Sequence, residues 1–98
     1  MANWTVFTNH GHILFLLALK PKIAVKEIAS EVGITERAAL RILSELSRDN
    51  FINVTKQGRC NSYSINSEMH LRHDIEKSCK VEDILKVIKK SNHTYQTA

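Results

Sequence analysis

The amino-acid sequence predicts a mainly α-helical domain that carries one small β-hairpin. Four segments have the composition or the apolar spacing of helices, and strand-like residues around Gly58 separate the third helix from the last. The 98 residues include one proline and three glycines, which argues against an all-β design with many tight turns. We therefore expect one modest core, enclosed mainly by helices.

The first helix is expected to begin at Thr8 or Asn9, either of which can cap it, and to end near Lys20, just before Pro21. Its sequence, HILFLLALK, is apolar on almost every side, so it needs a cover on more than one face. A second subunit could supply one cover, or the other helices and the N-terminal segment could complete it.

The stretch from Val25 to Leu46 predicts two helices joined by a tight turn. Gly33 is free to adopt the left-handed conformation that ends the first of them, and Thr35 is a suitable N-cap for the second. Asn50 is expected to end that second helix in the left-handed conformation. The apolar stripes of the two helices contain Val25, Ile28, Ala29, Val32, Ala39, Ile42, Leu43 and Leu46.

A hairpin is expected next, because strand-like residues from Phe51 onward and around Tyr63 enclose a turn at Lys56–Arg59. A final helix from Val81 to Lys90 carries one apolar stripe. Three helices, a two-stranded wing and a C-terminal helix follow one another as in a winged helix-turn-helix domain. We expect residues 1–90 to form that domain and residues 91–98 to form a flexible tail.

Several functional classes find no support in the sequence. It contains no glycine-rich phosphate loop, nucleophile elbow or paired-carboxylate motif, so we predict no catalytic residue, no cofactor and no enzyme activity. No signal peptide opens the chain and its longest apolar run is too short to cross a bilayer, so we expect a cytoplasmic protein without membrane contact. A net charge of +4 suits a polyanionic partner but is common in other small proteins.

Double-stranded DNA is the partner that the helix-turn-helix predicts. Arg37 and Arg41 lie on one face of the third helix, where arginines can contact guanine or phosphates, although Arg41 and Glu45 could instead form a surface ion pair. At the wing tip an arginine could enter a narrow, electronegative minor groove, and the lysines near the start of the second helix would contact phosphates. The predicted DNA-binding set is Thr35, Glu36, Arg37, Ala38, Leu40, Arg41, Ser44, Lys56, Arg59, Asn61 and Lys22.

The segments WTVFTNHGHILFLLA, GITERAALRILSEL, GRCNSY and LRHDIE resemble small bacterial and archaeal winged-helix transcriptional regulators related to the MarR and ArsR types. The resemblance covers residues 4–88 and implies sequence-specific DNA binding by a homodimer, with the third helix in the major groove and the wing on flanking DNA. It implicates Thr35, Arg37, Arg41 and Arg59. Ala38 and Leu40 depart from the pattern, since polar readers are frequent there, but apolar side chains can contact thymine methyl groups.

The apolar first helix and the terminal stripe suggest where a homodimer would form. The predicted interface is Ile13, Phe15, Leu16, Val81, Ile84, Leu85 and Ile88. The alternative function is a winged helix that binds another protein and does not read DNA.

The scattered residues Cys60, Cys79, His70 and His73 lack the close spacing of a dedicated metal site, and we predict none. We expect Arg72 and His73 to form a local polar network with the acidic residues Asp74 and Glu76. The sequence names no small-molecule effector.

Overall fold

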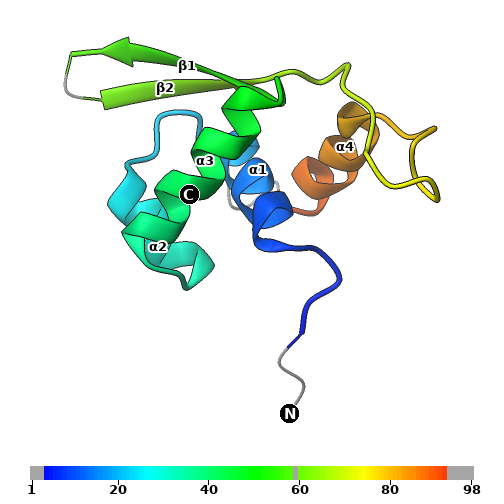
Figure 1. Ribbon diagram of the computed structural model, residues 1–98, viewed down its shortest axis with the longest axis horizontal. Helices are drawn as coiled ribbons and strands as arrows, with labels where there is room; N and C mark the ends of the chain where they lie inside the picture. The colour runs from blue at the N-terminus through cyan, green and yellow to red at the C-terminus, as the bar shows by residue number, and fades with distance from the viewer. Residues whose placement is uncertain (1–3, 59, 93–98) are drawn as a thin grey trace.

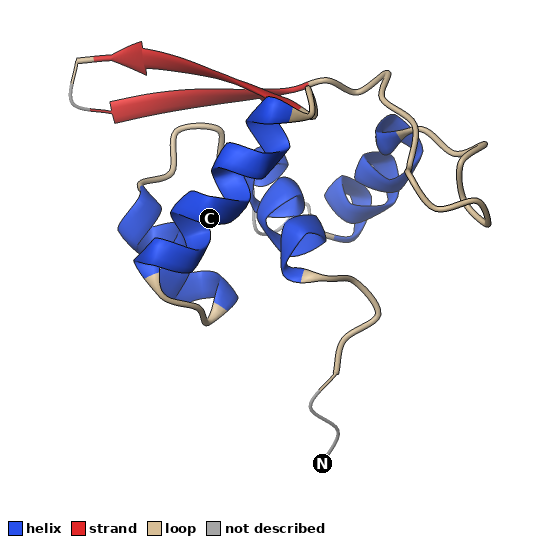
Figure 2. Cartoon of the chain, in the orientation of Figure 1, coloured by secondary structure: helices blue, strands red, loops and turns tan. Residues whose placement is uncertain are grey.

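The computed structural model describes residues 4–58 and 60–92, which form four helices and a two-stranded antiparallel hairpin. The elements are α1 (Asn9–Leu19), α2 (Val25–Val32), α3 (Glu36–Arg48), β1 (Ile52–Gln57), β2 (Cys60–Ile65) and α4 (Val81–Ser91). The hairpin lies along one side of the molecule, and α1 lies between α3 and α4 (Figures 1 and 2). This arrangement confirms the predicted winged helix-turn-helix fold.

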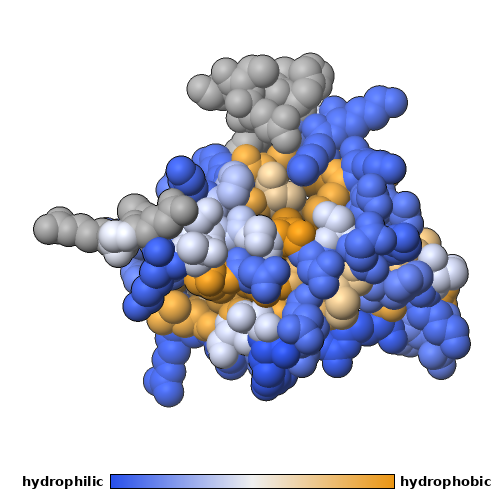
Figure 3. All heavy atoms as spheres, turned by 90° about the horizontal axis from the view of Figure 1, so that it is seen from above, coloured by the Kyte–Doolittle hydropathy of each residue, from blue (hydrophilic) through white to orange (hydrophobic). Residues whose placement is uncertain are grey.

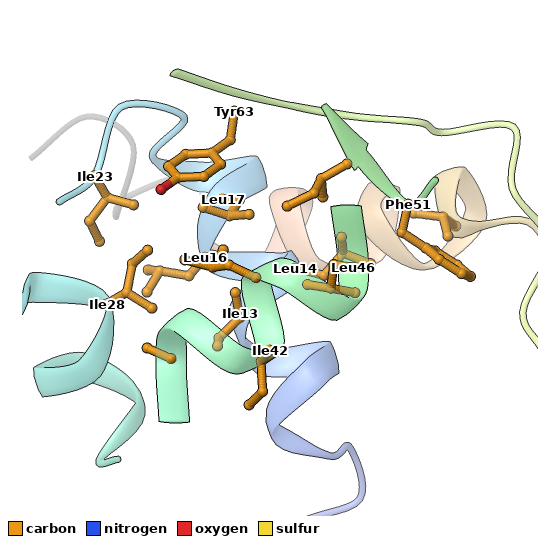
Figure 4. Close-up of a cluster of buried hydrophobic side chains, with 14 of the residues drawn as sticks. Ile13, Leu14, Leu16, Leu17, Ile23, Ile28, Ile42, Leu46, Phe51 and Tyr63 are labelled. Atoms are coloured by element: carbon orange, nitrogen blue, oxygen red, sulfur yellow. The ribbon is translucent and has the colours of Figure 1, made fainter. Parts of the chain in front are cut away.

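Helix α1 is the centre of the fold. It contacts α2, α3, α4 and β2, and the Thr8 hydroxyl caps its first turn by accepting a hydrogen bond from the Gly11 N–H at 3.4 Å. Ile13 and Leu17 of α1 are completely or almost completely buried among side chains from these elements (Figure 4). The cover that an all-round apolar helix requires therefore comes largely from within one chain.

The turn between α2 and α3 has the geometry that its residues predict. Gly33 has φ +85°, which an L side chain rarely adopts, and the Ile34 N–H donates to the Ala29 carbonyl at 3.0 Å. The Thr35 hydroxyl then accepts from the Ala38 N–H at 3.0 Å and caps α3. Buried Ala29 and Ala39 leave room for the two helices to approach each other.

The end of α3 is a left-handed cap without glycine. Asn50 has φ +68°, and its N–H donates to the Ser47 carbonyl at 3.1 Å. The following N–H, of Phe51, donates to the Leu46 carbonyl at 2.9 Å, which completes a Schellman motif. The side chains of Leu46 and Phe51 are both buried, so the cap directs the chain from α3 into β1 through the core.

The hairpin is joined to the helical part by its second strand. Its register pairs Ile52 with Ile65 and Gln57 with Cys60, which leaves a two-residue loop in which Gly58 has φ +65°. Buried Tyr63 donates its backbone N–H to the Pro21 carbonyl in the loop between α1 and α2 at 2.9 Å. The wing is therefore attached to the helical part through the loop between α1 and α2.

Residues 66–80 fold back before α4 begins. The N–H of Leu71 donates to the Cys79 carbonyl at 2.9 Å, and the N–H of Val81 donates to the Met69 carbonyl at 2.8 Å. Asp83 accepts the Lys80 N–H at 2.9 Å in the first turn of α4. Within the described residues, no helix is long and apolar enough to cross a membrane.

The structure corrects part of the predicted dimer interface. Four of its seven residues belong to the core of the chain and are at most 7% exposed: Ile13, Leu16, Val81 and Leu85. Helices α1 and α4 pack against each other, so one chain already covers these stripes. An apolar periodicity shows that a face is buried, but not which chain buries it. The other three, Phe15, Ile84 and Ile88, are partly exposed and stay candidates.

Candidate nucleic-acid interface

One face of α3 is presented to solvent beside the wing. Arg37, Leu40, Arg41 and Ser44 are all exposed and lie at i, i+3, i+4 and i+7, so they form one stripe along the helix. At 1.5 Å per residue this stripe is about 10 Å long, which is about three base-pair steps of duplex DNA. Thr35 is exposed at the N-terminal end of the same face, where backbone N–H groups favour an anion.

The cations of this region differ in how they are paired. Arg41 Nη1 lies 3.5 Å from Glu45 Oε2, and its side chain is 62% exposed. Exposed pairs of this kind are weak, so a phosphate can replace the glutamate. Within residues 4–58 and 60–92, Arg37, Lys22 and Lys56 are exposed and make no ion pair with an acidic side chain. These three side chains are available to a polyanion.

The wing and α3 enclose a shallow groove of about 420 Å³. Seen from the hairpin side, apolar patches lie among hydrophilic side chains (Figure 3). Lys56 and Asn61 face each other across the two strands, with Lys56 exposed and Asn61 half-buried at the groove. The groove is lined by Leu40, Leu43, Ser44, Ser47, Arg48, Val54, Asn61 and Tyr63.

The predicted DNA-binding residues therefore fall into three places. The α3 residues share the outward face, except that Ala38 is half-buried, and Glu36 is exposed in the first turn. Lys22 is exposed in the loop between α1 and α2, whereas Lys56 and Asn61 lie on the wing. Arg59 and the side chain of Cys60 lie outside what the structure describes.

The sequence-based prediction omits two residues of the groove, Arg48 and Val54. Arg48 follows Ser44 by one helical turn, and its side chain is 70% exposed. This spacing was a usable signal, but Arg48 lies at the end of the helix, away from the N-terminal half that usually meets base edges. Val54 looks like an inward strand residue in the sequence, and only the twist and packing of the hairpin reveal that it is exposed.

Acidic side chains near the C-terminal end of α3 and just after it connect the helix to the rest of the domain. His10 Nε2 lies 2.7 Å from Glu45 Oε1, and this hydrogen bond is the main reason that the pKa of Glu45 is lowered, with a smaller contribution from Arg41. Hydrogen bonding by Arg48 is the main cause of a lowered pKa at Asp49. Both carboxylates are therefore charged at neutral pH and hold their partners.

The expected network around Arg72 is different from the predicted one. Arg72 Nη1 lies 3.0 Å from Asp49 Oδ2 at the end of α3, and Asp74 pairs instead with Lys77 at 3.8 Å. The prediction is wrong because residues 66–80 fold back onto α3, a tertiary contact that sequence proximity does not reveal. His73 Nδ1 accepts a hydrogen bond from the Ile75 N–H at 3.1 Å.

The histidines and cysteines considered for metal binding are not clustered in the described part of the chain. No group of three or more His, Cys, Asp or Glu side chains there could hold a metal ion. His70 Nδ1 donates to the Lys77 carbonyl at 2.8 Å, and Cys79 is a half-buried free thiol.

Comparison with known proteins places this geometry in context. Residues 8–53 match the winged helix-turn-helix DNA-binding family. No curated protein sequence matches the chain. A predicted DNA-binding transcriptional regulator from E. coli has a similar structure, with a TM-score of 0.58 and 18% identity over 83% of this chain and 74% of that one.

Two longer proteins share the fold. ZitR of Lactococcus lactis, a zinc-responsive MarR family member, in complex with DNA, has a TM-score of 0.60 and 20% identity over 98% of this chain and 62% of its own. MepR of Staphylococcus aureus, a transcription regulator of the multidrug efflux pump MepA, has a TM-score of 0.57 and 16% identity over 94% of this chain and 64% of its own. The chain therefore spans less than two thirds of these two relatives.

The family match includes α1, α2 and α3, and so contains the complete helix-turn-helix. The structural likenesses extend the same fold through the wing and α4. The description of the matching family names DNA binding. The helix-turn-helix part of the chain therefore matches a winged helix-turn-helix DNA-binding family, and the chain as a whole has the fold of the MarR family member ZitR.

Proposed function

We propose that this protein is a transcriptional regulator that binds double-stranded DNA sequence-specifically as a homodimer in the cytoplasm. Helix α3 enters the major groove and the wing contacts flanking DNA. The observation that carries the proposal is the exposed stripe on α3, in which Arg37 and Arg41 alternate with Leu40 and Ser44 beside the groove of the wing. Arginine side chains at this spacing can reach guanine edges or phosphates.

The residues of α3 and the cations outside α3 have different tasks in this proposal. Arg37 and Arg41 contact bases or phosphates near the N-terminal half of α3, and Thr35 binds a phosphate there. Lys22, Lys56 and Arg59 add phosphate contacts, which raise affinity and salt dependence without reading sequence.

A homodimer would let two copies of α3 enter successive major grooves about 34 Å apart. The partly exposed residues Phe15, Ile84 and Ile88, together with Val87 on α4, are the candidates for its interface. These side chains come from α1 and α4, and not from the α3 stripe, so dimer formation would leave that stripe free for DNA.

The DNA-binding test compares the double variant Arg37→Ala/Arg41→Ala with the wild type. Fluorescence anisotropy with a duplex should show a steep loss of affinity between 50 and 200 mM salt, and the double variant should reduce the salt slope by up to about two for each bound subunit. Lys86→Ala/Lys89→Ala removes the same charge from exposed positions on α4 and is the matched control. Equal effects of the two double variants would contradict the assigned surface.

The oligomeric state has its own test. Sedimentation velocity at micromolar concentration should show a dimer, and Ile88→Glu should convert it to a monomer with unchanged helix content, because Ile88 is only half-buried in one chain. A wild-type monomer at these concentrations would contradict the homodimer and leave DNA binding by single copies to be measured.

A protein-interaction module is the second candidate function. The observation in its favour is a set of strongly exposed apolar side chains away from α3: Trp4, Val6 and Ile75. Salt-independent or undetectable duplex binding by the wild type would favour this candidate over DNA binding.

A further inference from the structure

The exposed large apolar side chains of the described residues fall into two groups. Trp4, Val6, Phe7, Ile75 and Val87 lie in the N-terminal segment, the loop before α4 and α4 itself. Leu40 and Val54 instead flank the groove between α3 and the wing. Single apolar residues on a surface are ordinary, but Leu40 is 54% exposed in the middle of a stripe whose other members are polar or cationic.

The neighbours of Leu40 restrict what can cover it. Arg37 and Arg41 lie within one helical turn of it, and Arg48 projects from the same helix toward the groove with its side chain 70% exposed. A partner that covers Leu40 must therefore offer a small apolar group surrounded by negative charge. This description fits the major groove of DNA, where base edges lie between two rows of phosphates.

The chemistry of the major groove identifies that apolar group. Base edges present hydrogen-bond donors and acceptors there, and the only apolar group is the C5 methyl of thymine. A leucine that faced a donor or an acceptor would desolvate it without replacing its hydrogen bond, which is unfavourable. 5-Methylcytosine carries the same methyl at the same ring position.

The structure also separates Leu40 from the other apolar residue at the start of α3. Ala38 is half-buried, and its N–H is used by the Thr35 cap. Leu40 lies about 4.5 Å farther along the helix than Arg37, near the centre of the exposed stripe. The side chain that can reach a base edge is therefore Leu40 and not Ala38.

We infer that Leu40 reads the C5 methyl group of a pyrimidine in the major groove. The inference rests on the proposed DNA binding by α3 and specifies one base preference within it. The two sources of the methyl are thymine and 5-methylcytosine, so methylation of a cytosine facing Leu40 strengthens binding.

The experiment begins with the tightest duplex that the full-length chain selects from a random 30-base-pair library. Each thymine is then replaced by uracil, which removes the methyl and leaves the hydrogen-bonding edge unchanged. At one thymine position in each half-site, the replacement should weaken binding about fourfold, which is the effect expected for one buried methyl group. Leu40→Ala should bind the thymine and uracil duplexes equally well.

The matched control is Ile75→Ala, which shortens an exposed apolar side chain in the loop before α4 and should keep the fourfold ratio. At the sensitive position, a duplex with 5-methylcytosine should bind about fourfold tighter than one with cytosine, and Leu40→Ala should abolish the difference. If Leu40→Ala abolishes only the difference between thymine and uracil, Leu40 reads the methyl of thymine. If it also abolishes the difference between 5-methylcytosine and cytosine, Leu40 reads the methyl of both bases.

The failure of this inference is distinguishable from that of the proposed function. Tight, salt-dependent duplex binding that no uracil substitution weakens would overturn the role of Leu40 and leave DNA binding intact. A preference of about fourfold for the thymine duplex over the uracil duplex that persists in Leu40→Ala would also overturn the role of Leu40. Absence of binding to any duplex would overturn the proposed function itself, and the inference with it.

Discussion

The two halves of α3 use their charged side chains in opposite ways. In the first half, Arg37 is exposed and, among the described residues, pairs with no acidic side chain. In the second half, Glu45 binds His10 at the start of α1, and Asp49, just after the helix, binds Arg72 from the loop before α4. One end of the helix is open to a partner, whereas the other is tied to two distant segments of the chain.

This difference shows how a small domain can present a rigid reading surface. The second half also carries the Schellman motif at Asn50 and the buried side chain of Leu46. The first half is held by the Thr35 cap and by close packing at Ala39. The contacts that fix the position of α3 therefore lie mostly where DNA is not expected to touch it.

The largest expected effect comes from the same substitution in the two halves. Leu46→Ala removes a buried side chain and should lower the free energy of unfolding by about 2–5 kcal/mol. Leu40→Ala shortens an exposed one and should change it by less than about 0.5 kcal/mol. Urea denaturation followed by circular dichroism measures both. Similar losses of unfolding free energy for the two variants would contradict the assignment of Leu46 to the core and of Leu40 to the exposed face.

The end of α3 offers a second test. Asn50→Ala places a residue that disfavours positive φ at +68°, and we expect a loss of about 1–2 kcal/mol in unfolding free energy. Asn50→Gly is the matched variant, because glycine adopts this conformation without strain and should be at least as stable as the wild type. If alanine were tolerated as well as glycine, the left-handed cap would not anchor this end.

The beginning of α3 should be less sensitive. Thr35→Ala removes the hydroxyl that accepts the Ala38 N–H, and we expect a loss of about 1 kcal/mol in thermal or urea unfolding. Thr35→Ser keeps the hydroxyl and should restore most of that loss. A cost greater than that of Leu46→Ala would reverse the proposed order of the two ends.

The smallest expected effect is a pH dependence at the anchored half. The pKa of Glu45 is lowered in the folded state, mainly by the hydrogen bond from His10, so its stabilising contribution is present at neutral pH. That contribution is lost as the pH falls from about 5 through the lowered pKa. Glu45→Gln should therefore show a flatter decline of melting temperature with acid than the wild type.

Glu76→Gln serves as the control for this measurement, since it removes a carboxylate from an exposed position in the loop before α4. An acid profile of Glu45→Gln that matches the wild type would show that the contact between α1 and α3 contributes nothing to the stability of the anchored half.

Local signals in the sequence predict the fold closely. Gly33, Thr35 and Asn50 each act through the backbone of their own turn, and all three adopt the predicted conformations. The outward face of α3 follows from helical periodicity alone. The apolar residues Ala39, Ile42, Leu43 and Leu46 mark the buried face, so Arg37 and Arg41 must lie on the opposite, exposed face.

Tertiary contacts explain where sequence reasoning failed. Ile13 and Val81 are apolar in a pattern that fits either a core or an interface, and only the packing of α1 against α4 decides between them. Arg72 has acidic neighbours in sequence, yet its partner is Asp49, 23 residues away. Exposure of Val54 likewise depends on how the wing lies against α3.

The hydrogen bond from the Tyr63 N–H to the Pro21 carbonyl has a consequence for protein engineering. The outer edge of β2 is occupied there by a segment from another part of the chain, so the wing is not a detachable module. A chimera that receives a new hairpin should also receive the loop between α1 and α2. Exchange of the wing alone would leave a strand edge unpaired, and such edges promote aggregation.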